Sequence, residues 1–281
     1  MLKPKVGHIQ FLNCLPLYYG LVKSEALLDL ELIKGTPTEL NSLLITGKLD
    51  ISPISSIEYA RHHKSLVLFP EFTVSSDGEV KSILLVSRSP IENLSGKKIA
   101  LTTTSATSQV LVKLILSRGY QVDPEYITCQ PDLGSMLAEA EAALLIGDIA
   151  LRHYLDRQNM YLYDLGAEWK KLTGKKMVYA VWAVNRNFAE TQDALNKHVF
   201  EIFKKSMDYS MEHLSEIAEY AARWEPFSPF FLMDYFRSLR FTFDKEYQEG
   251  LLHFYKLAEE IGAIEKVPEL EFISIHPGVR T

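Results

Sequence analysis

The sequence predicts an α/β protein built from two lobes. In the first two thirds of the chain, short runs typical of strands alternate with segments of helical spacing, which is the pattern of parallel βαβ units. Two extended runs, residues 80–86 and 177–184, bracket a stretch with its own alternation of strands and helices. The chain has 281 residues, 47% of them hydrophobic and 23% charged, as expected for an ordinary globular protein of one or two domains.

The two bracketing runs predict how the chain is divided between the lobes. If each is a strand that crosses from one lobe to the other, the chain enters the second lobe once and then returns. This predicts a discontinuous first lobe of residues 1–86 and 185–281, an inserted second lobe of residues 87–184, and a ligand cleft between them. Apolar residues keep helical spacing after residue 195, and we expect this helical tail to pack on the first lobe.

Asn13 follows the first predicted strand. Polar and apolar residues alternate over Lys5–Phe11, and a helix is expected over Leu17–Lys23. Ligands bind at the carboxyl ends of the strands in open α/β sheets, so Asn13 is a candidate site residue. A role as N-cap of the following helix explains Asn13 equally well.

Ser55 and Ser56 stand at a second junction of this kind. A strand is expected at 30–33 and a helix at 39–46, and a further strand at 48–53 leads into the two serines, which open another helix. Capping alone is the favoured explanation of these hydroxyls. A place at the ligand cleft is the alternative.

Ser82 lies in the last predicted strand of the first lobe. A short apolar strand at 65–69 precedes two extended runs, 71–76 and 79–87, which flank a turn at Ser76-Asp77-Gly78. A turn of this composition between two such runs predicts a β-hairpin.

The most informative stretch of the sequence runs from Ile99 to Leu116. A short apolar strand gives way to hydroxyl residues and then to an amphipathic helix with Gly119 just beyond its end. The free N–H groups of the first helical turn, together with the helix dipole, suit a carboxylate or phosphate at the strand's end. An ordinary helix cap at Ser105 or Thr107 is the commoner explanation. The candidate anion-binding turn comprises Ser105, Ala106, Thr107 and Ser108.

Gly147 and Asp148 mark a third junction. They follow the continuous apolar strand 142–146 and open a helix that extends to about Tyr154. Asp148 caps this helix or faces the same cleft as the 105–108 turn, and the two roles can coexist.

The charge and hydropathy of the chain exclude several classes of partner. The formal net charge is −6 and no block of Lys or Arg occurs, which argues against nucleic acid. No apolar run is long enough to span a membrane, and the N-terminus lacks the apolar region and cleavage site of a signal peptide. We therefore expect a cytoplasmic protein with no membrane partner.

The sequence contains no recognisable cofactor or metal motif. Cys14 and Cys129 lie far apart without metal-ligand spacing and are expected to be reduced thiols. No P-loop, dinucleotide fingerprint, zinc-protease helix or nucleophile elbow is present. We expect no cofactor, no metal, and a small anionic ligand that is either bound or converted. The sequence gives no indication of oligomeric state.

Several stretches resemble one known family, in order and along nearly the whole chain. Each stretch is short, but the set is specific. They are Val6–Pro16, Leu49–Ile51 with Ser55 and Glu58, Gly78–Ser82, Thr104–Ser108, Leu144–Asp148, Tyr163–Gly166 with Trp169, Thr173 with Gly174, and Ala180–Trp182. The set resembles chorismate dehydratase, the first enzyme of the futalosine route to menaquinone. The resemblance implies a two-lobed type II periplasmic-binding-protein-like fold with two crossover strands.

The resemblance also implies a reaction and a set of site residues. The reaction is that of a carbon–oxygen lyase, the loss of water from chorismate to give 3-[(1-carboxyvinyl)oxy]benzoate, with no cofactor. Ser55 occupies a position where the family varies between small hydroxyl residues. The resulting assignment is Asn13 and Ser82 for catalysis, and Ser55, Ser56, Ser105, Ala106, Thr107, Ser108, Gly147 and Asp148 for substrate binding.

On this assignment the 105–108 turn and Ser82 hold the two carboxylates of the substrate, and Asn13 binds the leaving hydroxyl or the developing enolate. An amide is no strong base, so the proton acceptor is either Asp148 or a carboxylate of the substrate, and we favour the substrate. Two alternatives remain open. One is a non-catalytic cytoplasmic binding protein for an organic anion; the other is the sister enzyme that acts on cyclic dehypoxanthine futalosine, against which the segment 10–13 argues.

Overall fold

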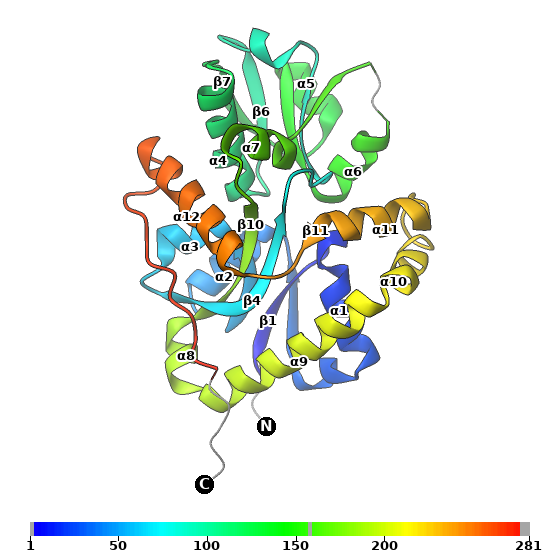
Figure 1. The fold of residues 1–281 in the computed structure, drawn as a ribbon, viewed down its shortest axis with the longest axis vertical. Helices are drawn as coiled ribbons and strands as arrows, with labels where there is room; N and C mark the ends of the chain where they lie inside the picture. Colours follow the sequence, from blue (N-terminus) through cyan, green and yellow to red (C-terminus); the bar gives the residue numbers. More distant parts are fainter. Residues whose placement is uncertain (1–2, 157–158, 276–281) are drawn as a thin grey trace.

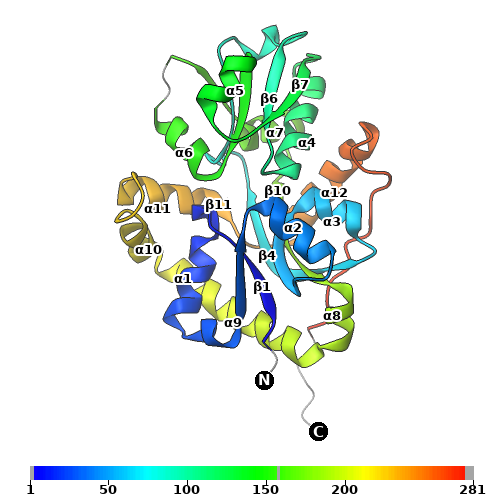
Figure 2. The same ribbon diagram turned by 180° about the vertical axis from the view of Figure 1, so that it is seen from behind.

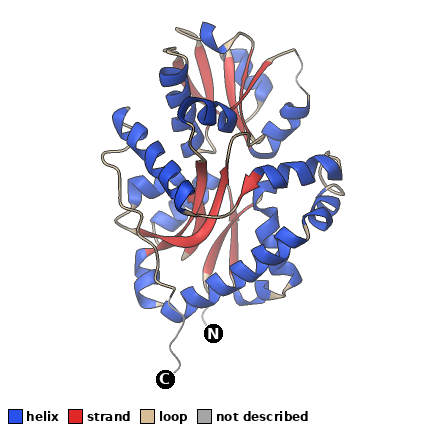
Figure 3. Cartoon of the chain, viewed as in Figure 1, coloured by secondary structure: helices blue, strands red, loops and turns tan. Residues whose placement is uncertain are grey.

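The computed structural model describes residues 3–156 and 159–275 and shows two lobes, each with its own β-sheet (Figure 1). The view from behind shows that the second lobe is joined to the rest by two neighbouring stretches of chain (Figure 2). Helices flank both sheets (Figure 3). The predicted two-lobed α/β architecture is therefore confirmed.

The sheet of the first lobe has six strands in the order β11-β4-β10-β3-β1-β2. The first three strands of the chain run parallel, as alternating βαβ units require, whereas β10 runs antiparallel to both of its neighbours. The carboxyl ends of β1 and β3 thus meet at one edge of the sheet. The strand bounds are β1 (Lys5–Ile9), β2 (Glu31–Gly35), β3 (Ile51–Ser55), β4 (Leu66–Ser76), β10 (Met177–Asn185) and β11 (Leu239–Arg240).

The helices of the first lobe come from both ends of the chain. The predicted packing of the tail on the first lobe is confirmed, because the hydroxyls of Ser206 and Ser210 on α9 donate to the carbonyl oxygens of Leu17 and Pro16 on α1. The helices are α1 (Leu15–Lys23), α2 (Pro37–Ile45), α3 (Ser56–His62), α8 (Arg186–Thr191), α9 (Asp193–Glu212), α10 (Leu214–Ala221), α11 (Pro229–Ser238) and α12 (Lys245–Glu260), with 3₁₀ turns at Leu12–Cys14 and Ala26–Asp29.

The sheet of the second lobe has five strands in the order β7-β6-β8-β5-β9. Its two faces are covered by different helices, since Leu111 of α4 and Trp169 of α7 belong to the large core, while Met136 of α5 and Ala150 of α6 belong to a separate cluster. The elements are β5 (Ile83–Ser87), β6 (Lys98–Thr102), β7 (Glu125–Cys129), β8 (Ala142–Ile146), β9 (Tyr161–Asp164), α4 (Ala106–Leu114) with a π-helical turn at Ile115–Gly119, α5 (Leu133–Glu139), α6 (Gly147–Leu155) and α7 (Leu165–Thr173), with a 3₁₀ turn at Ile91–Asn93.

The predicted hairpin of residues 71–76 and 79–87 is wrong. Residues 66–76 form one strand, β4, which pairs with β10 and β11, whereas β5 pairs with β8 and β9 in the other sheet. Gly78, with φ at +100°, does turn the chain, but the turn redirects it into the second lobe instead of reversing it. Near the C-terminal end, residues 270–273 form no strand of the sheet and make a single isolated bridge, between Leu68 and Phe272.

The crossings between the lobes consist of short irregular segments, residues 77–82 and 174–176. The predicted run 80–86 overlaps the first segment and continues into β5, which is paired entirely in the second sheet, and the predicted run 177–184 follows the second segment as β10, which is paired entirely in the first. Ser82 therefore lies at the end of the first crossing segment, immediately before β5.

Candidate functional site

A small cavity of about 60 Å³ lies between the lobes, where the ends of strands from both sheets converge. This volume holds only a few water molecules, so the lobes are closed on one another. No charged side chain of the described residues lines it. The polar lining consists of the side chains of Asn13, Cys14, Ser55, Ser82, Ser105, Ser108 and Tyr179.

Asn13 reaches this cavity from the 3₁₀ turn that follows β1. The amide oxygen of Asn13 is buried and has no hydrogen-bond partner among the described residues. The N-cap of α1 is Cys14, which makes no side-chain capping bond, so Asn13 does not cap that helix. An amide oxygen buried without a partner is costly in a folded protein, and a ligand with a donor group would satisfy it.

The residues of the anion-binding turn predicted at 105–108 do not all face the cavity. Ser105 caps α4 by accepting a hydrogen bond from the N–H of Ser108 at 3.2 Å, and it donates to the Ser108 hydroxyl at 2.8 Å. Both serines line the cavity, while Ala106 faces a separate groove with Thr38 and Gln109. The start of α4 therefore adds hydroxyls and the positive end of a helix dipole to the cavity.

Thr107 and Ser56 lie outside the cavity lining and join α4 to α3. The Thr107 hydroxyl accepts a hydrogen bond from the N–H of Ile57 at 3.2 Å and lies 3.2 Å from the Ser56 hydroxyl. Ser56 in turn donates to the carbonyl of Val178 at 2.8 Å. These two hydroxyls therefore hold the closed lobes together.

Ser55 does line the cavity. It occupies the N-cap position of α3, but its side chain makes no capping bond, so capping does not explain it. Its backbone N–H donates to the amide oxygen of Asn41 at 3.3 Å. Asn41, which the sequence analysis missed, positions this serine.

Ser82 and Gly147 meet at the opposite wall of the cavity. The N–H of Gly147 donates to the Ser82 carbonyl at 2.8 Å, and the Ser82 hydroxyl makes only a long bond of 3.3 Å to the Val80 carbonyl. Gly147 has φ at +63°, and a Cβ there would lie 3.2 Å from the ring of Phe11. Gly147 thus permits Phe11 to pack against the second lobe.

Asp148 lies behind this wall, outside the cavity lining. Its carboxylate accepts a hydrogen bond from the N–H of Leu12 at 3.1 Å, so it holds the turn that carries Asn13. The N-cap of α6 is Ile146, so Asp148 is not the capping residue. Burial raises the pKa of Asp148 to about 6, and the nearby carboxylate of Glu225 adds to this shift.

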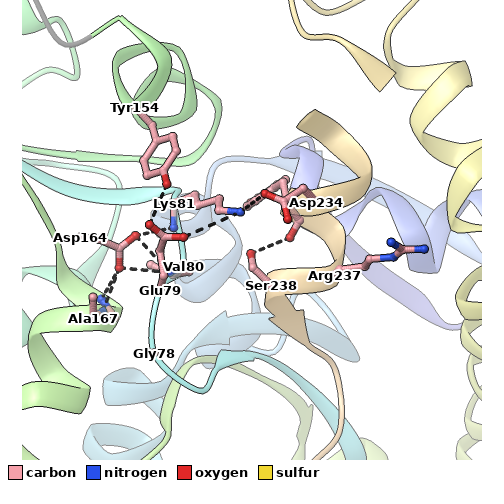
Figure 4. A network of polar contacts seen from close by, with 12 residues as sticks. Gly78, Glu79, Val80, Lys81, Tyr154, Asp164, Ala167, Asp234, Arg237 and Ser238 are labelled. Atoms are coloured by element: carbon pink, nitrogen blue, oxygen red, sulfur yellow. Dashed lines mark hydrogen bonds and ion pairs between the residues drawn. The ribbon is translucent and has the colours of Figure 1, made fainter. Parts of the chain in front are cut away.

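Two further groups that the sequence analysis missed hold the segment leading to Ser82. The carboxylate of Asp164 accepts hydrogen bonds from the N–H groups of Val80 at 3.1 Å and Lys81 at 2.5 Å (Figure 4). Burial raises the pKa of Asp164 to about 6 in spite of these bonds. The ammonium group of Lys81 forms an ion pair with Asp234 on α11 (Figure 4). Neither role has a signal in the local sequence.

Among residues 3–156 and 159–275, no group of three or more His, Cys, Asp or Glu side chains is placed to hold a metal ion. Cys14 and Cys129 are free thiols, as expected, and burial raises the pKa of Cys14 to about 12. Over the same described ranges, no helix has both the length and the apolar character needed to cross a bilayer.

Solved structures support the fold of this chain. The periplasmic aliphatic sulphonate binding protein of Escherichia coli superimposes with a TM-score of 0.69, covering 99% of this chain and 95% of its own, at 13% sequence identity. The periplasmic-binding-protein-like fold is thus confirmed.

Two relatives come from Thermus thermophilus. The chain is 30% identical over 272 residues to a protein named chorismate dehydratase, covering 92% of this chain and 94% of the relative. It is 24% identical over 206 residues to a protein named 1,4-dihydroxy-6-naphtoate synthase, covering 73% of each. The model of a family described as menaquinone biosynthesis matches residues 4–260. Because this model and the dehydratase relative both match nearly the whole chain, the chain belongs to the menaquinone biosynthesis family.

Proposed function

We propose that this protein is a carbon–oxygen lyase that dehydrates chorismate to 3-[(1-carboxyvinyl)oxy]benzoate. The observation that carries the proposal is the unpartnered amide oxygen of Asn13, which faces a cleft between the lobes lined by neutral hydroxyl groups. The likeness to a dehydratase over nearly the full chain supports the same substrate. The likeness to the synthase is lower in both identity and coverage, which favours the dehydratase.

The neutral lining determines how a substrate with two carboxylates would be held. Hydroxyl donors of Ser82, Ser105 and Ser108, and the positive end of the α4 dipole, are the groups available to them. Asn13 offers an amide for the leaving hydroxyl or the developing enolate. Orientation and charge stabilisation by fixed dipoles supply the catalysis.

The proton acceptor in this mechanism is a carboxylate of the substrate. Asp148 is the nearby protein carboxylate that the sequence suggested, but it lies outside the cavity lining and is engaged by the Leu12 N–H. Elimination moves the ring proton to the substrate carboxylate, and the resulting carboxylic acid passes that proton to the departing hydroxyl, which leaves as water when the ring becomes aromatic. Water is the only by-product, so atoms balance without a redox partner.

The closed cavity implies that the lobes separate during turnover. Pockets that hold ligands of this size measure roughly 300 Å³ or more, several times the 60 Å³ present here. Phe11 forms a wall of this cavity and also of a pocket of about 250 Å³ outside it, which Asn13 does not line.

Incubating the purified protein with chorismate and following the benzoate product by chromatography tests the proposal. Product formation without added cofactor, lost in Asn13→Ala, supports it. Binding of chorismate with no conversion would identify a binding protein instead. The expected location in the cytoplasm stays a prediction.

A further inference from the structure

The residue before Ser82 has an unusual backbone. Lys81 has φ at +62°, a left-handed conformation that side chains other than glycine adopt at a cost. Its side chain is only 7% exposed, although it carries a charge. Such a conformation persists only where the surrounding structure holds it, so contacts with residues distant in the sequence must hold the backbone of Lys81.

Contacts from both lobes fix this residue. Asp164 of the second lobe accepts the Lys81 N–H, and Asp234 of α11 in the first lobe pairs with its ammonium group (Figure 4). The Glu79 carboxylate lies 3.8 Å from the same ammonium group. The conformation of Lys81 sets the direction in which the chain enters Ser82.

The next residue on α11, Tyr235, is fully buried. Its hydroxyl makes no well-formed hydrogen bond within the described ranges, and Ser82 is the side chain within hydrogen-bonding reach of it. Burial raises the pKa of this phenol well above its usual range, while the nearby Ser82 hydroxyl opposes that shift. Asp234 thus pairs with Lys81, and the next residue on the helix, Tyr235, lies beside the next residue of the chain segment, Ser82. In the free protein the buried phenol therefore lies beside Ser82 without a well-formed hydrogen bond to it.

We propose that α11 positions the Ser82 hydroxyl for the reaction, with Asp234 fixing Lys81 and Tyr235 donating a hydrogen bond to Ser82 once substrate is bound. This inference rests on the proposed dehydration. A serine hydroxyl has one proton to donate and two lone pairs to accept, so Ser82 can donate to a substrate carboxylate while accepting from Tyr235. Hydrogen bonds in such a chain polarise one another, which strengthens the bond to the substrate. Tyr235 and Asp234 are positioning residues and do not touch the substrate.

Tyr235→Phe gives the cleanest test, because it removes only a hydroxyl that makes no well-formed hydrogen bond in the free protein. We expect an unchanged or slightly higher melting temperature and a fall in kcat of roughly three- to tenfold, the size of one neutral hydrogen bond. Tyr59→Phe is the matched control. Tyr59 is also fully buried, but its hydroxyl donates to the Glu269 carbonyl at 3.0 Å away from the cavity, so this variant should melt lower with an unchanged kcat.

A double-mutant cycle with Ser82→Ala separates positioning from simple loss of fold. Asp234→Asn and Tyr235→Phe should each lower kcat in the wild-type background and have no further effect when Ser82 is already alanine. Glu260→Gln, which breaks the ion pair with Arg118 at 3.0 Å elsewhere between the lobes, should lower activity by the same small factor, if at all, in both backgrounds.

The outcomes distinguish this inference from the proposed function. An active wild type whose kcat is unaffected by Tyr235→Phe, or an equal loss in both backgrounds of the cycle, overturns the role of α11 alone. A wild type that leaves chorismate unchanged overturns the dehydration, and the role of α11 with it.

Discussion

The carboxylate of Asp148 on α6 accepts a hydrogen bond from the backbone N–H of Leu12, 136 residues earlier in the chain. This bond connects the second lobe to the turn that carries Asn13. Asp148 therefore acts on the cavity from behind, by holding the residue next to Asn13. Loss of this acceptor is expected to loosen Asn13, whereas loss of the charge alone is not.

Asp148→Asn is thus expected to retain most of the turnover, because the asparagine oxygen can still accept the Leu12 N–H. Asp148→Ala removes the acceptor and should lower kcat about tenfold, with a smaller change in KM. Steady-state kinetics of both variants with chorismate provide the measurement. If Asp148→Asn is folded but inactive, Asp148 is the proton acceptor, and the substrate carboxylate is not.

The raised pKa of Asp148 predicts a stability difference that depends on pH. Its pKa is about 6 in the folded protein and near 3.8 when unfolded. The folded state binds this proton more tightly than the unfolded state does. The resulting contribution to the free energy of unfolding is fully present below the unfolded-state pKa and is lost as the pH rises through the folded-state pKa of about 6. Each pKa unit corresponds to about 1.4 kcal/mol, so up to about 3 kcal/mol is involved.

Asp148→Asn should therefore gain stability relative to the wild type as the pH rises from 4 to 7. Denaturant unfolding of both proteins at a series of pH values gives this difference. The comparison with the variant is essential, because burial lowers the pKa of His8 in the neighbouring pocket to about 4, and that histidine has the opposite pH dependence. A difference that stays constant across this range would mean that the Asp148 carboxylate is not desolvated.

Asn13→Ala is expected to lower kcat by about two orders of magnitude, the scale for losing one positioned donor, because it removes the amide NH2 that can donate to the developing enolate as well as the amide oxygen. The free energy of unfolding should stay the same or rise, since the amide oxygen has no partner among the described residues. Asn41→Ala is a useful comparison, because Asn41 is bonded to Ser55 and its loss should lower stability. Near-normal turnover in Asn13→Ala would remove Asn13 from the mechanism.

Local rules predicted the parts of this molecule that depend on neighbours in sequence. The strand-to-helix junctions and the cap at Ser105 follow from residue type and spacing, and the structure has them where expected. The hairpin was wrong because the turn at Gly78 is a local feature, whereas the choice of partner for β5 depends on the whole second sheet. Sequence patterns constrain the pairing of distant strands only weakly.

The site residues at the strand ends could be predicted from the sequence, whereas those whose surroundings depend on contacts between the lobes could not. Asn13, Ser55, Ser82 and Ser105 converge because they follow or precede strands whose ends meet. Whether a hydroxyl faces the cavity or the opposite lobe depends on how the lobes close, which is why Thr107 could not be placed in advance. The hydroxyl of Tyr235 gives no sequence signal either, since a tyrosine in a helix resembles any other core residue.

Gly147→Ala tests whether the close approach of the lobes at Phe11 matters for binding. The left-handed backbone should reduce stability by about 1–2 kcal/mol, and the new methyl group should displace the Phe11 ring and raise KM for chorismate. Gly174→Ala is the matched control: its φ is +68°, and a Cβ there meets no atom within 4 Å. The control should lose similar stability with an unchanged KM. Equal KM values in the two variants would show that contact between Gly147 and Phe11 has no part in forming the site.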